Sequence, residues 1–384
     1  MQPLRFATAG SVDDGKSTLI GRLLYDARAI QEDQLAAVER ASQRRGAEGL
    51  DLSLITDGLE AEREQGITID VAYRYFATPK RKFIIADSPG HEQYTRNMAT
   101  GASNADAIVL LVDVTKGLLP QTRRHLEIAR LLGIRQAVAF VNKMDLVGYS
   151  QDALRSLELD GLEAIPGSAL RGDMVVERGE ALGWYQGPTL LERLESFQAG
   201  AEQAAGGPFR FPVQLVSRPF AGEPRSYMGR IESGCILAGA PVKVLPAGRR
   251  TAVRKILAHG TERDIAVAGD SVNLVLADDI DIARGDLIAD AGQPPLQTRA
   301  LDVTLVWLAH EPLRPGGRYL VQQSARRILA KVSGEALQLN DIGQARLALH
   351  APLFVDPYDR VRATGALILI DEATNHTVAA GLVR

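Results

Sequence analysis

The chain has 384 residues, of which 46% are hydrophobic, and a formal net charge of −3. That length exceeds what one ordinary hydrophobic core supports, so the composition predicts a soluble protein of two or three domains. The charge excludes a net basic field and so disfavours nucleic-acid binding. The longest apolar run is AIVLLV at 107–112, which is far shorter than the roughly 20 residues that a membrane-spanning helix needs. No membrane partner is therefore expected.

The first predicted strand, Leu4–Ala9, runs directly into a glycine-flanked turn that precedes an apolar, helix-like segment. No basic and apolar leader comes before this strand, so export is not expected. The turn, GSVDDGKST, satisfies the GxxxxGK[ST] spacing of a P-loop, in which backbone N–H groups and the N-terminus of the following helix surround a phosphate. The expected nucleotide-binding residues of this turn are Gly10, Ser11, Val12, Asp13, Asp14, Gly15, Lys16, Ser17 and Thr18.

Individual roles follow from the mechanism of such loops. Lys16 is expected to reach the terminal phosphates as a catalytic residue, and the Ser17 hydroxyl to bind magnesium. The side chains of Asp13 and Asp14 are expected to point away from the phosphates, because the loop binds its ligand with the backbone. A chance turn is the alternative, and the strand and helix on either side weigh against it.

A charged segment, Ile55–Asp70, comes next and ends in a threonine-bearing strand edge. This pattern is typical of a loop that folds over a bound nucleotide. Thr68 is therefore the candidate for a second hydroxyl on magnesium, lost when the γ-phosphate leaves. We interpret the charges of the EAERE run within this segment as a solvated helix face instead.

The predicted strand at 81–87 ends in Asp87, where P-loop proteins place the acid that holds magnesium, usually through water. The Gly90 N–H that follows can touch a γ-phosphate because no side chain intervenes, so this loop can sense that phosphate. His91 stands one residue further on, where it can orient an attacking water. The remaining histidines are interpreted as packing or surface residues: His125, His259, His310, His350 and His376.

The predicted strand at 136–142 leads into the tetrapeptide NKMD, which indicates the choice of base. A carboxylate at Asp145 can accept both N–H groups of a guanine edge, which adenine lacks, while the stem of Lys143 can lie against the ring. Adenine would leave that acid unpaired, so the motif, with Asn142 at its start, favours GTP over ATP.

The tetrapeptide GSAL at 167–170 completes the expected base site with Ser168, Ala169 and Leu170. The Ala169 N–H is expected to donate to the guanine oxygen. Either tetrapeptide alone is common and specifies little. In this order, after the P-loop and DSPGH, coincidence is a poor explanation.

Strand-like and helix-like segments alternate over this half of the chain, which predicts a mostly parallel sheet with helices on both faces. Ligands collect beyond the carboxyl ends of the strands of such a sheet, where these motifs fall. A linker is predicted at 199–212, and the short alternating strands after it predict closed β-barrels, with Cys235 as a small core residue of one strand. Cys235 is the only cysteine, which excludes an internal disulfide and fits a reducing cytoplasm.

A second break at 291–300 divides the barrel part in two. The expected fold class is thus an α/β P-loop GTPase domain followed by two all-β barrel domains. The expected bounds of these three domains are 1–200, 208–295 and 298–384.

Several of these motifs together carry a family resemblance: GSVDDGKSTLIGRLL, EREQGITID, DSPGHEQYTRNM, NKMD and GSAL resemble the translation-factor class of GTPases, similar in plan to elongation factor Tu. Further stretches narrow the resemblance to the GTPase subunit of bacterial sulfate adenylyltransferases. These stretches are NMATGASNADAIVLLVD, GDMVVERGEALGWYQGPTLLE, DDIDIARGD and DPYDRVRATGALILIDEATNHTVAAG. The resemblance implies a cytoplasmic, magnesium-dependent GTPase in a heterodimer with a smaller, ATP-binding subunit. It also implies that GTP hydrolysis drives formation of adenosine 5′-phosphosulfate and pyrophosphate from ATP and sulfate.

A single GxxxxGK[ST] is present, so adenylyl transfer is expected in another chain and kinase activity is not expected. A translation factor that binds aminoacyl-tRNA remains an alternative, because fold does not settle function. The clusters SARRILAK and the GRR near Arg249 could touch RNA, although solvated strand ends are the simpler interpretation. A nodulation-type enzyme that makes activated sulfate for sugar sulfation shares the same chemistry and also stays open.

Two departures from the family pattern lie beside the base motifs. The segment between Asp145 and Ser168 is shorter than expected by about ten residues, or about 15 Å if all were helical. A helix flanking the guanine pocket is therefore expected to be trimmed. Gly167 stands where a β-branched residue is expected, so the affinity for guanine or the contact with a partner is expected to differ from that of the family.

Overall fold

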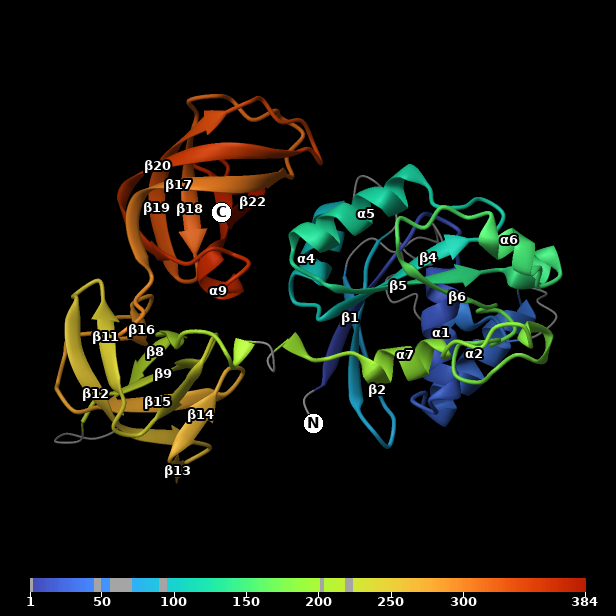
Figure 1. Ribbon diagram of the computed structural model, residues 1–384, viewed down its shortest axis with the longest axis horizontal. Helices are drawn as coiled ribbons and strands as arrows, with labels where there is room; N and C mark the ends of the chain where they lie inside the picture. Colours follow the sequence, from blue (N-terminus) through green and yellow to red (C-terminus); the bar gives the residue numbers. More distant parts are fainter. Residues whose placement is uncertain (1–2, 45–49, 56–70, 90–94, 201–203, 218–223) are drawn as a thin grey trace. The chain divides into compact units, whose positions relative to one another are not determined.

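The computed structural model of the chain describes residues 3–44, 50–55, 71–89, 95–200, 204–217 and 224–384. Two compact units follow one another along the sequence, Met1–Gly200 and Ala201–Arg384 (Figure 1). None of the helices in the described ranges combines the length and the hydropathy that a bilayer crossing requires.

The first unit is built on a six-stranded sheet with the order β2-β3-β1-β4-β5-β6. Its strands are β1 (Leu4–Ala9), β2 (Ala72–Ala77), β3 (Lys82–Asp87), β4 (Ala107–Asp113), β5 (Gln136–Asn142) and β6 (Glu163–Pro166). Among these six, β2 runs antiparallel to β3, and the other neighbouring pairs are parallel. The expected mostly parallel sheet is confirmed.

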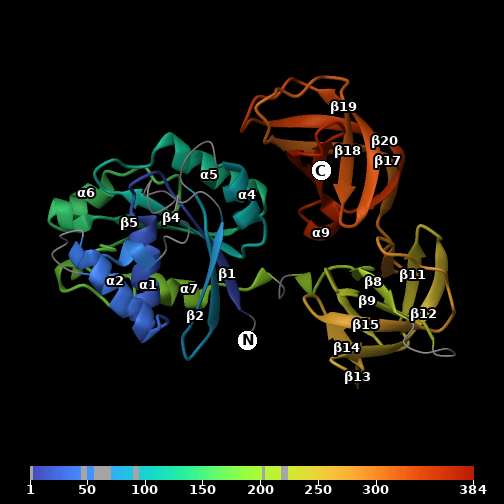
Figure 2. The ribbon, with the colours of Figure 1, turned by 180° about the vertical axis from the view of Figure 1, so that it is seen from behind.

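Helices cover both faces of this sheet, with α1 and α7 on one side and α4 and α5 on the other (Figures 1 and 2). The helical elements of the unit are α1 (Lys16–Asp26), α2 (Glu32–Arg44), η1 (Leu52–Ile55), α4 (Thr95–Ser103), α5 (Pro120–Leu131), η3 (Met144–Val147), α6 (Gln151–Arg155), η4 (Glu180–Leu182) and α7 (Leu190–Ser196). Leu23 of α1 and Leu194 of α7 pack with Phe6 and Phe140 of the sheet in one core. Because both faces are covered, every residue of β4 is buried, as a continuous apolar strand requires.

The strand order indicates at which edge of the sheet a ligand is expected to bind. The chain leaves β1 in the middle of the sheet, with β3 on one side and β4 on the other, so the carboxyl end of β1 lies at a topological switch point. The parallel strands β3, β4 and β5 end at the same edge, in Asp87, Asp113 and Asn142. The P-loop sequence and the NKMD sequence therefore meet there.

Ten strands occupy the first part of the second unit, counted over 204–217 and 224–290. They are β7 (Arg210–Pro212), β8 (Leu215–Ser217), β9 (Ser226–Arg230), β10 (Cys235–Leu237), β11 (Pro241–Leu245), β12 (Arg249–Ala258), β13 (Thr261–Arg263), β14 (Ile265–Val267), β15 (Ser271–Leu276) and β16 (Leu287–Asp290). The main sheet has the order β7-β16-β11-β12-β15-β9-β8, with β13 beside β12, and β10 and β14 form a separate pair.

The two end strands of this sheet are joined by only two residues of chain. The Val213 N–H donates to Asp286 O at 2.8 Å, and the Gln214 N–H donates to Met228 O at 2.9 Å. Residues 210–217 therefore act as one bent strand that pairs with β16 at its start and with β9 at its end. The sheet closes on itself through this bend rather than through a ladder between β7 and β8.

The last part of the chain forms a closed barrel in the order β17-β20-β19-β18-β21-β22. Its elements are β17 (Leu296–Trp307), β18 (Arg318–Gln323), β19 (Arg326–Gly334), β20 (Ile342–Val355), α9 (Arg362–Gly365), β21 (Ala366–Asp371) and β22 (Thr377–Val383). Trp307, Val321 and Leu369 lie in its core. The expected fold class, an α/β P-loop domain followed by two all-β domains, is confirmed, whereas the bounds 208–295 and 298–384 stay a prediction.

Cys235 is exposed on β10, so its expected place in a core was wrong. Ile236 points into the core, and Cys235 and Leu237 on either side of it therefore face solvent. A strand of three residues offers too little alternation to reveal which face a single side chain takes.

Candidate nucleotide-binding site

The loop between β1 and α1 turns so tightly that two of its positions admit only glycine. Gly15 has a φ of 95°, and a Cβ atom built on it would lie 2.4 Å from Asn142 Nδ2. At Gly10, with a φ of 155°, a Cβ atom would lie 2.9 Å from Leu111 O. The backbone of the loop therefore approaches β4 and β5 closely, as a P-loop at a switch point must.

Lys16 opens α1 and is buried, with 8% of its surface exposed. Its Nζ donates to Gly10 O at 3.0 Å and to Ser11 O at 2.9 Å. Burial lowers the pKa of the ammonium, and the nearby Asp14, Asp87 and Asp13 charges oppose that shift. Both hydrogen-bond partners are neutral carbonyls, so the positive charge lies inside the loop without a direct ion pair among the described residues.

The two acids of the loop behave differently. Asp13 is exposed and takes a left-handed φ of 64°. Asp14 is buried, and its Oδ2 accepts the Ser11 N–H at 2.7 Å. Burial raises the pKa of Asp14, although the Ser11 hydrogen bond and the Lys16 charge lower it. Asp14 thus folds back onto the loop itself, and the expectation that both acids point away from the phosphates stays a prediction.

Asn142, at the carboxyl end of β5, joins the phosphate loop to the base loop. Its Nδ2 donates to Asp14 O at 2.8 Å, and its Oδ1 accepts the Ala169 N–H at 2.8 Å. The buried Asn142 side chain thus connects two loops, because Asp14 lies 128 positions before it in the sequence and Ala169 lies 27 positions after it.

Lys143 adds a second connection to the P-loop. Its Nζ donates to Asp13 O at 2.7 Å and to Asp113 Oδ2 at 2.8 Å. With a left-handed φ of 65°, Lys143 reverses the chain before η3 and brings its stem across the loop edge. This is compatible with the expected contact between that stem and a guanine ring.

Asp113 is a site residue that the sequence reasoning missed. It ends β4 beside Asn142, and it accepts hydrogen bonds from Thr115 N at 2.9 Å and Thr115 Oγ1 at 2.6 Å as well as from Lys143. Burial alone would raise the pKa of Asp113, but the hydrogen bonds from Lys143 and Thr115 outweigh it and hold that pKa below its usual range. The available signal was an acid at the carboxyl end of a buried parallel strand, the same signal that identified Asp87.

Asp145 lies in the first turn of η3. Its Oδ1 is buried, and none of the described residues donates a hydrogen bond to it. A buried carboxylate oxygen with unused acceptor capacity fits a ligand edge that carries N–H donors. Selection of guanine by Asp145 stays a prediction that this geometry favours.

The base loop at 167–170 is a turn held by its neighbours. The Ser168 N–H donates to Asp173 O at 3.2 Å, and Ser168 Oγ accepts the Arg171 N–H at 3.2 Å. The Ala169 amide, expected on the guanine oxygen, is engaged by Asn142 Oδ1 in this structure. A guanine oxygen would have to share or displace that bond. Leu170 is 62% exposed, and its apolar side chain stands at the surface beside the loop.

The structure gives a reason for glycine at position 167. A Cβ atom there would lie 2.5 Å from Asp173 O and 2.6 Å from Phe140 Cζ. The ring of Phe140, fully buried on β5, thus occupies the space that a β-branched side chain would need. Downstream of Asp145, α6 has five residues, with Ser150 as its N-cap, and the trimming of a helix beside the guanine pocket stays a prediction.

Three of the expected site residues, Thr68, Gly90 and His91, lie outside the described residues, and their roles stay predictions. For magnesium, the remaining candidates offer oxygen donors, the ligands that this cation prefers: the Ser17 hydroxyl at the start of α1 and the Asp87 carboxylate buried at the end of β3. In the described ranges no group of three or more His, Cys, Asp or Glu could hold a metal. That donor set fits a P-loop magnesium, which takes other ligands from phosphate and water.

The histidines outside the expected site are packing or surface residues, as predicted. His125 is fully buried on α5, and its Nε2 lies 2.9 Å from Gln121 Nε2. Burial lowers the pKa of His125 to about 3, with smaller contributions from the Lys16 and Arg124 charges. The exposed histidines are His259, His310, His350 and His376.

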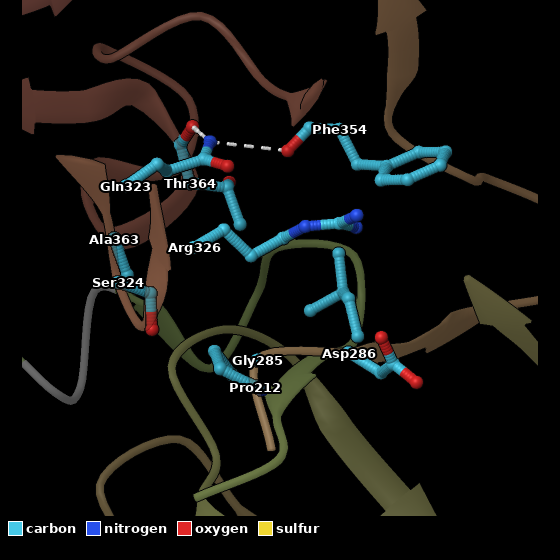
Figure 3. Close-up of a pocket in the computed structure, with 10 residues that line it drawn as sticks. Pro212, Gly285, Asp286, Gln323, Ser324, Arg326, Phe354, Ala363 and Thr364 are labelled. Atoms are coloured by element: carbon cyan, nitrogen blue, oxygen red, sulfur yellow. Dashed lines mark hydrogen bonds between the residues drawn. The ribbon is translucent and has the colours of Figure 1, made fainter. Parts of the chain in front are cut away.

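The second unit contains a small cavity, which Figure 3 shows in close-up. Residues of the main sheet, of the closed barrel and of their adjoining loops line it, among them Asp286, Gln323, Arg326 and Phe354. The Arg326 guanidinium lies over the Phe354 ring at 5.7 Å. The cavity volume of about 20 Å³ suits a single water molecule, so it is no candidate for a nucleotide site.

Comparison with known proteins bears on the same parts of the chain. Residues 2–199 match the family described as elongation factor Tu GTP binding domain, and residues 330–384 match the GTP-eEF1A C-terminal domain-like family. A solved structure of a bacterial selenocysteine-specific elongation factor, EF-Sec, is 26% identical with a TM-score of 0.47; the comparison covers 100% of this chain and 58% of that one.

Three curated relatives, each named sulfate adenylyltransferase subunit 1, are 48% identical to this chain and each comparison covers 99% of it. They come from Aeromonas hydrophila, Laribacter hongkongensis and Citrobacter koseri, and the chain covers 86%, 85% and 86% of their lengths. The chain therefore belongs to the sulfate adenylyltransferase subunit 1 family and carries an elongation-factor-Tu-type GTP-binding domain.

Proposed function

We propose that this chain binds and hydrolyses GTP as the regulatory subunit of a sulfate adenylyltransferase. A smaller partner subunit with the ATP and sulfate site would form adenosine 5′-phosphosulfate and pyrophosphate, an uphill reaction that GTP hydrolysis drives. The observation that carries the proposal is the bridge made by Asn142, which holds the phosphate loop at Asp14 and the base loop at Ala169 as one surface. Family membership supports the coupling to sulfate activation.

At the phosphate end, Lys16 supplies positive charge to the transferring phosphoryl group. Its ammonium is already desolvated and held by two neutral carbonyls, so an anion gains more from it than from an exposed lysine. The hydroxyls of Ser17 and Thr68 and the Asp87 carboxylate would hold magnesium. When bound, that ion neutralises charge developing on the phosphate oxygens.

The γ-phosphate is sensed by the Gly90 N–H, and His91 orients water for in-line attack; sequence position supports both roles. At the other end, Asp145 presents a buried carboxylate oxygen to the guanine edge, and Lys143 places its stem beside the ring. The partner subunit then responds to the difference between the GTP and GDP states, because a nucleotide shifts an equilibrium only through contacts that differ between the two.

One experiment tests the whole proposal. The chain is co-purified with its suspected smaller subunit, and pyrophosphate release from ATP and sulfate is measured with and without GTP. We expect release that depends on GTP and stops with a non-hydrolysable analogue. GTP-independent release, or none from a demonstrably assembled complex, would return the chain to a generic GTPase.

The alternative of an aminoacyl-tRNA carrier is separated by a second measurement. Phosphate contacts make nucleic-acid binding weaken steeply with salt. Salt-dependent binding of aminoacyl-tRNA in the GTP state would favour the translation factor, whereas the proposed function predicts none.

A further inference from the structure

The base loop at 167–170 lies in a turn and not within a helix or strand, so its position depends on the side chains that grip it. Asn142 holds its Ala169 amide from the side of the P-loop. The carbonyls of Ala169 and Leu170 are acceptors that Asn142 does not serve, and they take donors from another side chain. Arg22 supplies both.

Arg22 lies on the helix that begins at Lys16. Its Nε donates to Ala169 O at 3.2 Å, and its Nη2 donates to Leu170 O at 2.6 Å. The remaining nitrogen, Nη1, lies 3.6 Å from Asp26 Oδ1, one helical turn further on. The side chain is 18% exposed, so its guanidinium is held on three sides and largely removed from solvent.

This fork is specific to arginine. A guanidinium presents several N–H donors in one plane at fixed spacing, which lets it span two consecutive carbonyls while keeping an ion pair. A lysine ammonium is a compact point charge and cannot hold that geometry. The contact also joins residues 147 positions apart, from the phosphate-binding helix to the base-binding turn.

We infer that Arg22 is a positioning residue that fixes the base loop for guanine and so slows nucleotide release. The inference rests on the proposed GTP-binding function. Arg22 acts through Ala169 and Leu170 rather than on the nucleotide itself. Preorganising a binding loop strengthens binding mainly by removing the cost of ordering that loop when the ligand arrives.

The test compares Arg22→Gln and Arg22→Lys with a matched pair, Arg178→Gln and Arg178→Lys. Arg178 lies in the same unit and also donates to two main-chain carbonyls, those of Tyr185 at 3.5 Å and Gly187 at 2.7 Å, away from the base loop. Release of a fluorescent GDP is followed after mixing with excess unlabelled GDP. GTP hydrolysis gives kcat and KM, and the melting temperature is measured without nucleotide.

We expect both Arg22 substitutions to speed GDP release and raise KM about tenfold, a loss of about 1.4 kcal/mol of binding free energy, with kcat unchanged. The Arg178 variants should match the unsubstituted chain in all three measurements. Unchanged release in the Arg22 variants, rescue by lysine, or a parallel loss of kcat and of the nucleotide-free melting temperature would each overturn the inference. Failure of the unsubstituted chain to bind GDP would instead overturn the proposed function. A separate titration of the unsubstituted chain with fluorescent GDP distinguishes this outcome from the others.

Discussion

Asp145 offers a buried carboxylate oxygen that no described residue engages, so base selection is predicted to rest on this one side chain. Asp145→Asn replaces one of the two carboxylate oxygens by an NH₂ donor and should reduce GTP affinity by about 10²-fold or more, because one guanine N–H group then faces a donor in place of an acceptor. Affinity for xanthosine triphosphate, which carries an oxygen in place of the amino group, should rise. Competition binding against labelled GDP measures both. Asp152→Asn, an exposed change on α6, is the control, and a variant that still preferred GTP would refute the guanine interpretation.

His125 predicts a pH dependence of stability with a definite sign. Its folded-state pKa of about 3 lies below the ordinary value of 6.5, so the unfolded chain gains a proton in a range where the folded chain does not. The stabilising contribution of the neutral ring is complete above pH 6.5 and falls by up to about 1.4 kcal/mol per pH unit as pH decreases toward 3.

Urea unfolding followed by circular dichroism at 222 nm checks this prediction, because the longer described helices, α1, α2, α4, α5 and α7, all belong to the first unit. His125→Gln should flatten the change in stability between pH 7 and pH 5. His350→Gln, at an exposed position, should keep the full slope. Equal slopes in the unsubstituted chain and His125→Gln would show that this ring does not titrate as described.

Residues with a motif could be located from the sequence, whereas residues that act through distant contacts could not. Lys16 and Asn142 follow from the spacing of short motifs, and the structure brings both to the same sheet edge. The role of Arg22 depends on a turn 147 positions away. Asp113 could have been located as an acid at the end of a buried strand, but its contact with Lys143, the residue after the neighbouring strand, could not. The sequence around Arg22 and around Asp113 contains no pattern that predicts either contact.

At the scale of elements, Gly167 and Phe140 form a matched pair between β5 and the base loop. Gly167→Val would bring a Cβ atom to 2.6 Å from the Phe140 ring and should lower the free energy of unfolding by about 1–3 kcal/mol through overpacking. Phe140→Leu in the same chain should recover part of that loss. The double-mutant cycle is measured by urea unfolding.

Gly183 provides the control for this cycle, because the nearest atom to a Cβ there lies 3.9 Å away. Gly183→Val should change stability by less than about 0.5 kcal/mol. Additive effects of the Gly167 and Phe140 substitutions would show that the ring does not account for the glycine.

The strands with the strongest pattern could be placed to the residue. Leu4–Ala9 and Gln136–Asn142 coincide with the predicted strands, because a central strand that is covered on both faces is largely apolar. Short barrel strands were less readable, as the misplaced Cys235 shows. The closure of 210–217 by a bend depends on hydrogen bonds to β9 and β16, which local sequence does not encode.

At the scale of the second unit, a buried ion pair joins β7 of the main sheet to the residue that follows β20 of the closed barrel. Arg210 on β7 donates Nε and Nη2 to the two oxygens of Asp356, each at 2.8 Å, and Thr364 Oγ1 adds a third bond at 2.7 Å. Both charged side chains are almost fully buried. Removing one partner leaves the other charge buried and unpaired, which costs about 3–5 kcal/mol, whereas replacing both by apolar groups is often close to neutral.

We therefore predict that Arg210→Met strongly lowers the stability of this unit and that adding Asp356→Leu restores most of the loss. Fluorescence of Trp307 reports unfolding of the second unit in a chain that carries Trp184→Phe. Arg225→Met, which removes exposed ion pairs with Asp279 and Asp281, should change little and serves as the control. A double variant less stable than Arg210→Met would contradict the argument.

The bridge made by Asn142 has a consequence for how the site empties. Since one amide group contacts both loops, movement of either loop strains or breaks a hydrogen bond to the Asn142 side chain, and we expect the two loops to move together when the site is empty. A protein that accelerates nucleotide exchange then needs to displace only one of the two loops, whichever it can reach, and the other loop loosens as a consequence.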